Sequence, residues 1–158
     1  MPLADDGDIV RALGFVTLYA AYIEEAVDDC VSVLNTADVE VDERLFRQPI
    51  SEKIRYCQRR LRGLVPLTDE LEYLPGALDY TRKLLEARHD VVHGRLYAGV
   101  NGQDIRRSGR QGVPDRQVTS GELYELANAL FDARGPLLHA SEFRLQRLLK
   151  RPPPDAAP

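Results

Sequence analysis

An arginine and a histidine, Arg88 and His93, stand near the end of a predicted helix. Arg88 falls in the row that should face a core or a partner, and this row reads Leu78, Thr81, Leu85, Arg88 and Val92. A guanidinium in such a row is costly unless an anion pairs with it. A phosphate is one such anion, and histidine is the side chain best suited to moving protons near neutral pH. The pair therefore indicates phosphate chemistry.

The spacing of this pair leaves its geometry open. At 100° per residue, Arg88 and His93 lie about 140° apart on an ideal helix and about 7.5 Å apart along its axis. They can meet if the released last turn lets the His93 ring swing, or if they converge with their counterparts on a second chain. In the alternative interpretation, Arg88 forms a salt bridge and His93 interacts with the negative end of the helix dipole.

Two histidines in this segment also raise the question of a metal site. His89 and His93 are four residues apart and share a helical face, and Asp90 lies beside them. Two imidazoles at this spacing can bind zinc, but the sequence shows no third ligand. We therefore expect neither a metal nor a cofactor.

The segment from Ala87 to Gly94, ARHDVVHG, resembles the signature of the HEPN superfamily. That signature is an arginine, a polar residue, three further positions and a histidine at a helix end, and His89 occupies the polar position. The resemblance implies a small helical bundle that dimerises, with two Arg–His pairs meeting in a cleft at the subunit interface. Many members are metal-independent ribonucleases of toxin–antitoxin, abortive-infection or CRISPR systems. Others bind nucleotides or serve only as interaction modules.

The resemblance also implies a mechanism and a role for each residue. An RNA 2′-hydroxyl attacks the adjacent phosphorus, which leaves a 2′,3′-cyclic phosphate. His93 acts as general base, or as general acid towards the leaving 5′-oxygen. Arg88 neutralises the charge that builds on the phosphorus, and such preorganised electrostatics is commonly the larger contribution. His89 or Asp90 orients either group.

Basic side chains follow the signature and are candidates for RNA binding. Arg95, Arg106, Arg107 and Arg110 could guide the RNA backbone, and Tyr97 could stack on a base. The alternatives are a solvated basic loop and a strand tyrosine that covers the bundle. Toxins paired with nucleotidyltransferase antitoxins resemble one another in a tyrosine two residues after the histidine. Here that position is Arg95, so regulation by modification of this tyrosine is not expected.

Size and composition predict one globular domain. The chain has 158 residues and a net charge of -4, and 44% of its residues are hydrophobic. We expect a single domain over residues 1–150 and a disordered proline-rich tail over residues 151–158. The absence of a long apolar run or a secretory signal predicts a cytoplasmic protein without a membrane partner. Residues 88–116 hold six arginines against three aspartates, which permits a local phosphate site in an acidic chain.

Helical periodicity predicts four main helices, at residues 8–34, 51–63, 75–94 and 119–150, with Asp8, Ser51 and Thr119 as N-caps. Two apolar faces on the first helix make its second face a candidate subunit interface. Gly135 and Pro136 should kink or split the last helix. Short strands at 95–98 and 104–106 predict a hairpin. The expected fold is all-α, an antiparallel bundle of four to five helices with a small β-hairpin insertion before the last long helix.

These observations together predict a homodimeric, metal-independent endoribonuclease of HEPN type. Such a protein would serve as a toxin or phage-defence effector, with RNA as substrate and an antitoxin or another regulatory protein as partner. The alternative is a noncatalytic HEPN-like module for dimerisation or for binding a nucleotide or RNA. Paired carboxylates of the glycosidase type and a serine nucleophile motif are absent, so the sequence does not favour those hydrolase classes.

Overall fold

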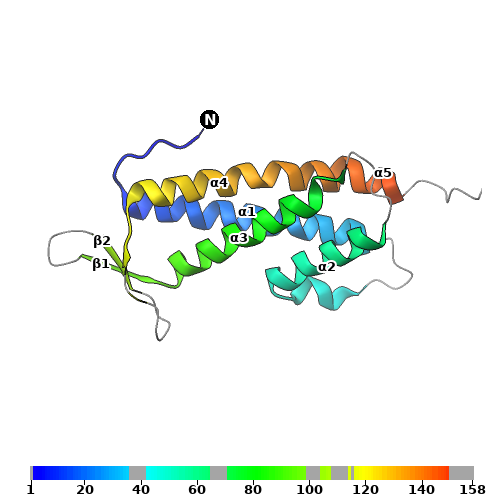
Figure 1. Cartoon of the computed structure of the whole chain (residues 1–158), viewed down its shortest axis with the longest axis horizontal. Coiled ribbons are helices and arrows are strands. Elements are labelled where there is room, and N and C mark those ends of the chain that lie inside the picture. Colours follow the sequence, from blue (N-terminus) through cyan, green and yellow to red (C-terminus); the bar gives the residue numbers. More distant parts are fainter. Residues whose placement is uncertain are drawn as a thin grey trace, which may run out of the picture. The chain divides into compact units, whose positions relative to one another are not determined.

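A computed structural model describes residues 2–35, 42–64, 71–98, 104–107, 114 and 116–149. These residues are mostly helical, as predicted (Figure 1). The longer helices are α1 (Ile9–Asn35), α2 (Ile50–Gly63), α3 (Leu74–Val92) and α4 (Ser120–His139). The shorter elements are the 3₁₀-helix η1 (Glu43–Arg47), the strands β1 (Arg95–Ala98), β2 (Asp104–Arg107) and β3 (Arg116–Gln117), the π-helix η3 (Ala140–Leu145) and α5 (Gln146–Leu149). No helix of this described part combines the length and the apolar character that crossing a membrane requires.

The chain divides into two compact units, which are described separately. The first unit comprises Met1–Ile23 and Thr81–Ala133, and the second comprises Glu24–Tyr80 and Arg134–Pro158. Helices α1, α3 and α4 each contribute a segment to both units. The boundary therefore falls inside helices rather than in a linker, so composition along the sequence gives no sign of it. The predicted tail at 151–158 lies outside the described residues.

The first unit has a helical core. Its buried apolar residues recur every three to four positions along each helix, as expected for one buried face. They are Ala12, Val16, Ala20 and Ile23 of α1, Leu84, Leu85 and Val91 of α3, and Leu123, Tyr124, Ala127, Leu130 and Ala133 of α4. Each fully buried large aliphatic side chain contributes roughly 1.5–3 kcal/mol by its removal from water.

The second unit has its own core, which includes both cysteines. The enclosed residues are Val27, Cys30, Val31 and Leu34 of α1, Ile54, Cys57 and Leu61 of α2, Leu74 and Leu78 of α3, and Leu137 of α4. The Cys30 thiol donates to the carbonyl of Leu137 at 3.5 Å. Burial raises the pKa of Cys30 to about 12 and also raises the pKa of Cys57. Both cysteines are thus protonated core residues, free of any disulfide.

The helix starts follow local sequence chemistry with one exception. A side-chain oxygen of Asp8 accepts from the backbone N–H of Val10 and Arg11, at 3.0 and 2.9 Å, so the predicted cap of α1 is confirmed. Thr119 and Glu122 form the predicted capping box, since each side chain accepts from the other residue's backbone N–H, at 3.2 and 3.3 Å. The predicted Ser51 cap is wrong, because α2 begins at Ile50, directly after Pro49. Pro49 is the N-cap residue, and its carbonyl accepts the first helical hydrogen bond, from the backbone N–H of Lys53 at 3.2 Å.

The last helix is not split at Gly135 and Pro136, so that part of the prediction is wrong. Helix α4 continues through Pro136 to His139, and the irregular π-helix follows only afterwards. Proline removes the hydrogen bond to the carbonyl four residues earlier, at Asp132. Both Pro136 and Asp132 are exposed, so water can bind that carbonyl and the helix need not end there.

A small antiparallel sheet follows α3 in the first unit. Its strand order is β1-β2-β3. The register of β1 and β2 aligns Arg95 with Arg107 and Tyr97 with Ile105. The register of β2 and β3 aligns Arg106 with Arg116. The sheet therefore collects arginine positions directly after the His93 end of α3.

Candidate functional site at the end of helix α3

Arg88 lies where the buried row of α3 approaches the end of the helix. Leu78 and Thr81 are fully buried and Leu85 is 7% exposed, which confirms that this row faces the core. Arg88 itself is half-buried. Its Nε atom is enclosed and has no hydrogen-bond partner among the described residues, and no ion pair from Arg88 is seen there. An unpaired buried donor costs about 1–3 kcal/mol, so the guanidinium is suited to an anionic ligand.

His93 is the first residue after α3, and it lies in the turn that leads towards β1. Its backbone N–H still donates to the carbonyl of His89 at 3.1 Å, so the position of His93 is fixed by the last helical hydrogen bond. The His89 and His93 rings lie 4.3 Å apart between centroids, with their planes tilted by 49°. Both histidines are exposed. The structure therefore brings together the two imidazoles, and Arg88 stays on another side of the helix, about 140° from His93 at 100° per residue.

A pocket beside the last turns of α3 has a different chemistry. It holds about 260 Å³, and its lining includes the carboxylates of Asp90, Glu122 and Glu125. Arg116, the one basic residue among the described residues of the lining, forms an ion pair with Glu122 at 3.2 Å. The predicted catalytic pair does not line this pocket. Three carboxylates would repel a phosphate, so the anion expected at Arg88 does not belong in this pocket.

The described residues contain no group of three or more histidine, cysteine or carboxylate side chains that could hold a metal ion. His89 and His93 are two neighbouring imidazoles. Asp90 adjoins the pocket rather than completing a metal site with the two imidazoles.

The predicted RNA-binding positions are distributed over the sheet. Arg95 and Tyr97 lie on β1, Arg106 and Arg107 lie on β2, and Arg110 lies outside the described residues. The register pairs arginine with arginine twice, at 95 with 107 and at 106 with 116. Like charges at directly opposed positions destabilise a sheet unless something anionic lies near them.

Sequence reasoning missed Arg116 as a member of this group. It is exposed on β3, directly opposite Arg106 in the register. Arg116 ends the arginine-rich stretch 88–116, which was the available signal in the sequence. The sequence alone does not show that Arg116 lies opposite Arg106.

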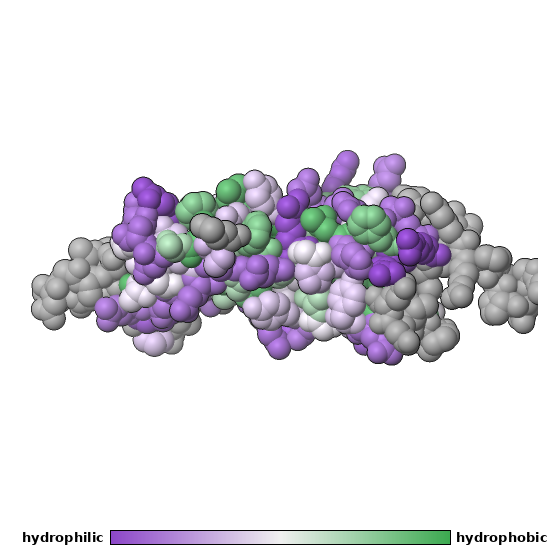
Figure 2. Space-filling view, turned by 90° about the horizontal axis from the view of Figure 1, so that it is seen from above, coloured by the Kyte–Doolittle hydropathy of each residue, from purple (hydrophilic) through white to green (hydrophobic). Residues whose placement is uncertain are grey.

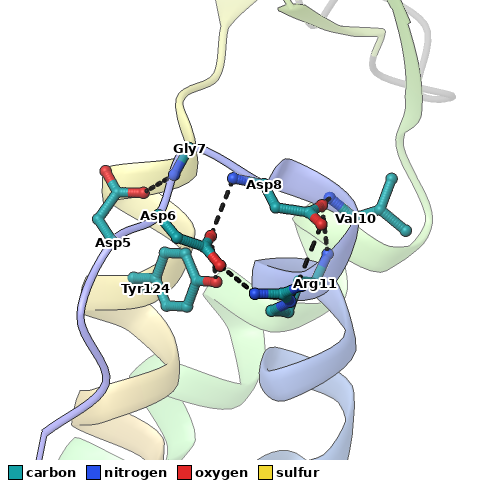
Figure 3. A network of polar contacts seen from close by, with 7 residues as sticks. All are labelled: Asp5, Asp6, Gly7, Asp8, Val10, Arg11 and Tyr124. Atoms are coloured by element: carbon teal, nitrogen blue, oxygen red, sulfur yellow. Dashed lines mark hydrogen bonds and ion pairs between the residues drawn. The ribbon is translucent and has the colours of Figure 1, made fainter.

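A polar network fixes the start of α1 against the start of α4 in the first unit (Figure 3). The Tyr124 hydroxyl donates to Asp6 at 2.7 Å, and Arg11 forms an ion pair with the same carboxylate. The hydrogen bond from Tyr124 lowers the pKa of Asp6. Burial and the bond to Asp6 raise the pKa of Tyr124 to about 12. These groups keep their charge states near neutral pH, so the network positions helices rather than transferring protons.

Comparisons of the chain with protein-family models, with curated proteins and with solved structures found no match.

Proposed function

We propose that the protein is a metal-independent endoribonuclease of HEPN type. The observation that carries this proposal is the enclosed Nε of Arg88, five residues before His93, which has no hydrogen-bond partner among the described residues. The sheet that follows supports the proposal, because its register opposes arginines at two places. A polyanion near the end of α3 would satisfy both features. We choose RNA as this polyanion because the segment ARHDVVHG resembles the HEPN signature.

In the proposed reaction, RNA supplies its own nucleophile. His93 removes the proton of the 2′-hydroxyl, whose oxygen then attacks the adjacent phosphorus. Arg88 neutralises the added negative charge on the phosphoryl oxygens. The bond from phosphorus to the 5′-oxygen breaks, and the His93 imidazole, now protonated, gives that oxygen its proton. His89, whose ring contacts His93, is the positioning residue for this imidazole.

We propose that the active form is a homodimer of antiparallel helical bundles. An aromatic face of the first unit is a candidate interface. Tyr19 contacts Phe15, Tyr22 and Phe131, at ring-centroid distances of 5.8, 6.2 and 5.1 Å. Tyr22 and Phe131 are 37% and 46% exposed. Figure 2 shows hydrophobic areas among hydrophilic ones on the face that it draws. Covering exposed aromatic rings is a common source of binding energy at protein interfaces.

The proposed cellular role is that of a cytoplasmic toxin or phage-defence effector. Such a ribonuclease would damage its own host unless an antitoxin or another regulatory protein bound it. The second candidate function is a noncatalytic module for dimerisation or for nucleotide or RNA binding. The exposed aromatic face favours it, because an interaction module needs that surface but not His93.

Incubation of the purified protein with mixed RNA in EDTA tests the proposal. Arg88→Ala and His93→Ala should each reduce cleavage by about 10²–10⁴-fold. The matched controls are Arg147→Ala and His139→Ala, which change exposed residues of the same types in the second unit and should cleave like the wild type. Mass spectrometry should find 2′,3′-cyclic phosphate ends. Folded wild-type dimer that leaves transfer, messenger and structured RNA intact would favour the noncatalytic module.

A further inference from the structure

The second unit carries a run of basic side chains that the proposed active site does not use. Residues 43–63, which form η1 and α2, hold seven basic and two acidic side chains. The chain as a whole has a net charge of -4. The net charge of this segment is therefore positive, whereas that of the rest of the protein is negative. Such a local excess of basic residues suggests an anionic ligand.

Three of the arginines share the outer face of α2. The inner face is buried in the core, with Ile54 and Cys57 fully enclosed. At 100° per residue, Arg55, Arg59 and Arg62 fall within about 60° of one another and opposite that inner face. All three are exposed. A rise of 1.5 Å per residue spreads them over about 10 Å of helix. We call these three residues the arginine strip.

The neighbouring carboxylates neutralise little of this strip. Glu52 pairs with Arg55 at 2.5 Å, whereas the described residues provide no ion pair for Arg59 or Arg62. Like charges three and four residues apart destabilise a helix. The acidic side of α1 meets another edge of α2, where Lys53 binds Asp28 at 2.6 Å. The strip therefore remains a line of positive charge open to solvent.

The 3₁₀-helix η1 adds two arginines and an aromatic ring. Arg44 and Arg47 share one side of η1, because this helix type has three residues per turn. Both are exposed, and Phe46 is 40% exposed, while Leu45 anchors the turn in the core. An exposed aromatic ring among cations is the combination with which proteins bind single-stranded nucleic acid: the ring stacks on a base and the cations contact phosphates.

We propose that the outer face of η1 and α2 binds single-stranded RNA, at a site distinct from Arg88 and His93. The choice of RNA as the polyanion rests on the proposed function. Guanidinium groups suit this ligand because their planar donors match phosphate oxygens in pairs. A lipid surface fits less well, because the apolar face of α2 is already buried in the core and cannot insert into a membrane.

Fluorescence anisotropy with a labelled, mixed-sequence single-stranded RNA of about 20 nucleotides, long enough for several phosphate contacts, tests this site. The full-length protein carries Arg88→Ala and His93→Ala, so that cleavage does not interfere. Adding Arg59→Gln and Arg62→Gln removes two phosphate contacts. The slope of log K against log salt should fall in magnitude by about 1.4, and binding at 0.1 M salt should weaken by about 25-fold. Phe46→Ala should weaken binding without changing that slope.

A matched pair, Lys83→Gln with Arg147→Gln, removes the same charge from exposed positions elsewhere and should change binding by less than about threefold. An unchanged affinity and salt slope after loss of Arg59 and Arg62 would overturn the proposal. Equal losses in the matched pair would also overturn it, because only net charge would then matter. Two other anionic probes test the choice of ligand: phosphatidylserine vesicles and soluble polyglutamate. If either binds to the arginine strip as tightly as RNA does, the choice of RNA is refuted. If the wild-type protein binds RNA through the arginine strip but does not cut it, the proposed ribonuclease activity is refuted and the proposed binding site is not.

Discussion

Replacing Arg88 by methionine should make the protein more stable while abolishing its proposed activity. The Nε of Arg88 is enclosed without a hydrogen-bond partner in the described part of the chain, and such a donor costs about 1–3 kcal/mol. Methionine has a similar length, no polar group, and enough flexibility to pack in the row that contains Leu85. We expect the free energy of unfolding to rise by about 1–2 kcal/mol, since the substitution removes the enclosed, unpaired donor and keeps the apolar length of the side chain.

Urea denaturation measures this gain directly. The midpoint should rise with the m-value unchanged, since the surface exposed on unfolding is the same. For a chain of this size, each kcal/mol should also raise the melting temperature by about 2–4 °C. RNA cleavage by the variant should fall to the level of Arg88→Ala. Higher stability together with lost activity is expected of a residue kept for a ligand rather than for the fold.

Lys53→Met is the matched control. The Lys53 side chain is 11% exposed and binds Asp28 at 2.6 Å, so it is a mostly buried cation that has its partner. Its removal leaves the enclosed Oδ1 of Asp28 without its cation, although the Asp28 side chain as a whole is 39% exposed. We therefore expect a loss of about 1–3 kcal/mol. If Arg88→Met instead lowered stability by 1 kcal/mol or more, Arg88 would be a structural residue and the reasoning for an anion site would fail.

Four further outcomes follow from described contacts. The pKa of Asp6 is lowered in the fold, so its contribution to stability is complete above its ordinary pKa of 3.8 and is lost as the pH falls through the folded value; Asp6→Asn should flatten the acid side of the stability curve. The pKa of Tyr124 is raised from 10 to about 12, so its contribution to stability is lost as the pH rises across that interval. Absorbance titration should show a phenol that ionises near pH 12 in the wild type and is missing from Tyr124→Phe. Cys30 and Cys57 are buried, so a thiol reagent should label them only in denaturant; rapid labelling of native protein would contradict the described core. Thr119→Ala should lower the free energy of unfolding by about 1 kcal/mol, since it removes one half of the capping box, and an unchanged urea midpoint would speak against that cap.

Features that depend on a few neighbouring residues were predictable from the sequence. Asp8 and Thr119 begin α1 and α4 as expected, because an N-cap needs only a short side chain and the backbone of the next turn. Leu78, Thr81 and Leu85, which precede Arg88 in its row of α3, are buried as their spacing predicts, because helical period decides which residues share a face.

Features that depend on distant partners were not predictable. The continuation of α4 through Pro136 depends on solvent access at Asp132, which only the folded surroundings determine. The opposition of Arg106 and Arg116 depends on strand register, and the two positions are ten residues apart in a stretch without clear period. The arginine strip of α2 was recognisable as basic residues, but only the burial of the opposite face makes it a single outer surface.

Mixing two inactive variants will show whether the proposed active site is shared between chains. Arg88 and His93 lie about 140° apart around the helix, which favours contact between residues of different protomers over contact within one. In an isologous dimer with composite sites, a heterodimer of Arg88→Ala and His93→Ala chains contains one intact site and one that lacks both residues. Random exchange makes about half of the dimers heterodimeric, so the mixture should regain about one quarter of wild-type cleavage. Sites formed within single chains would regain none, and then the end of α3 must reshape to bring the His93 ring across to Arg88.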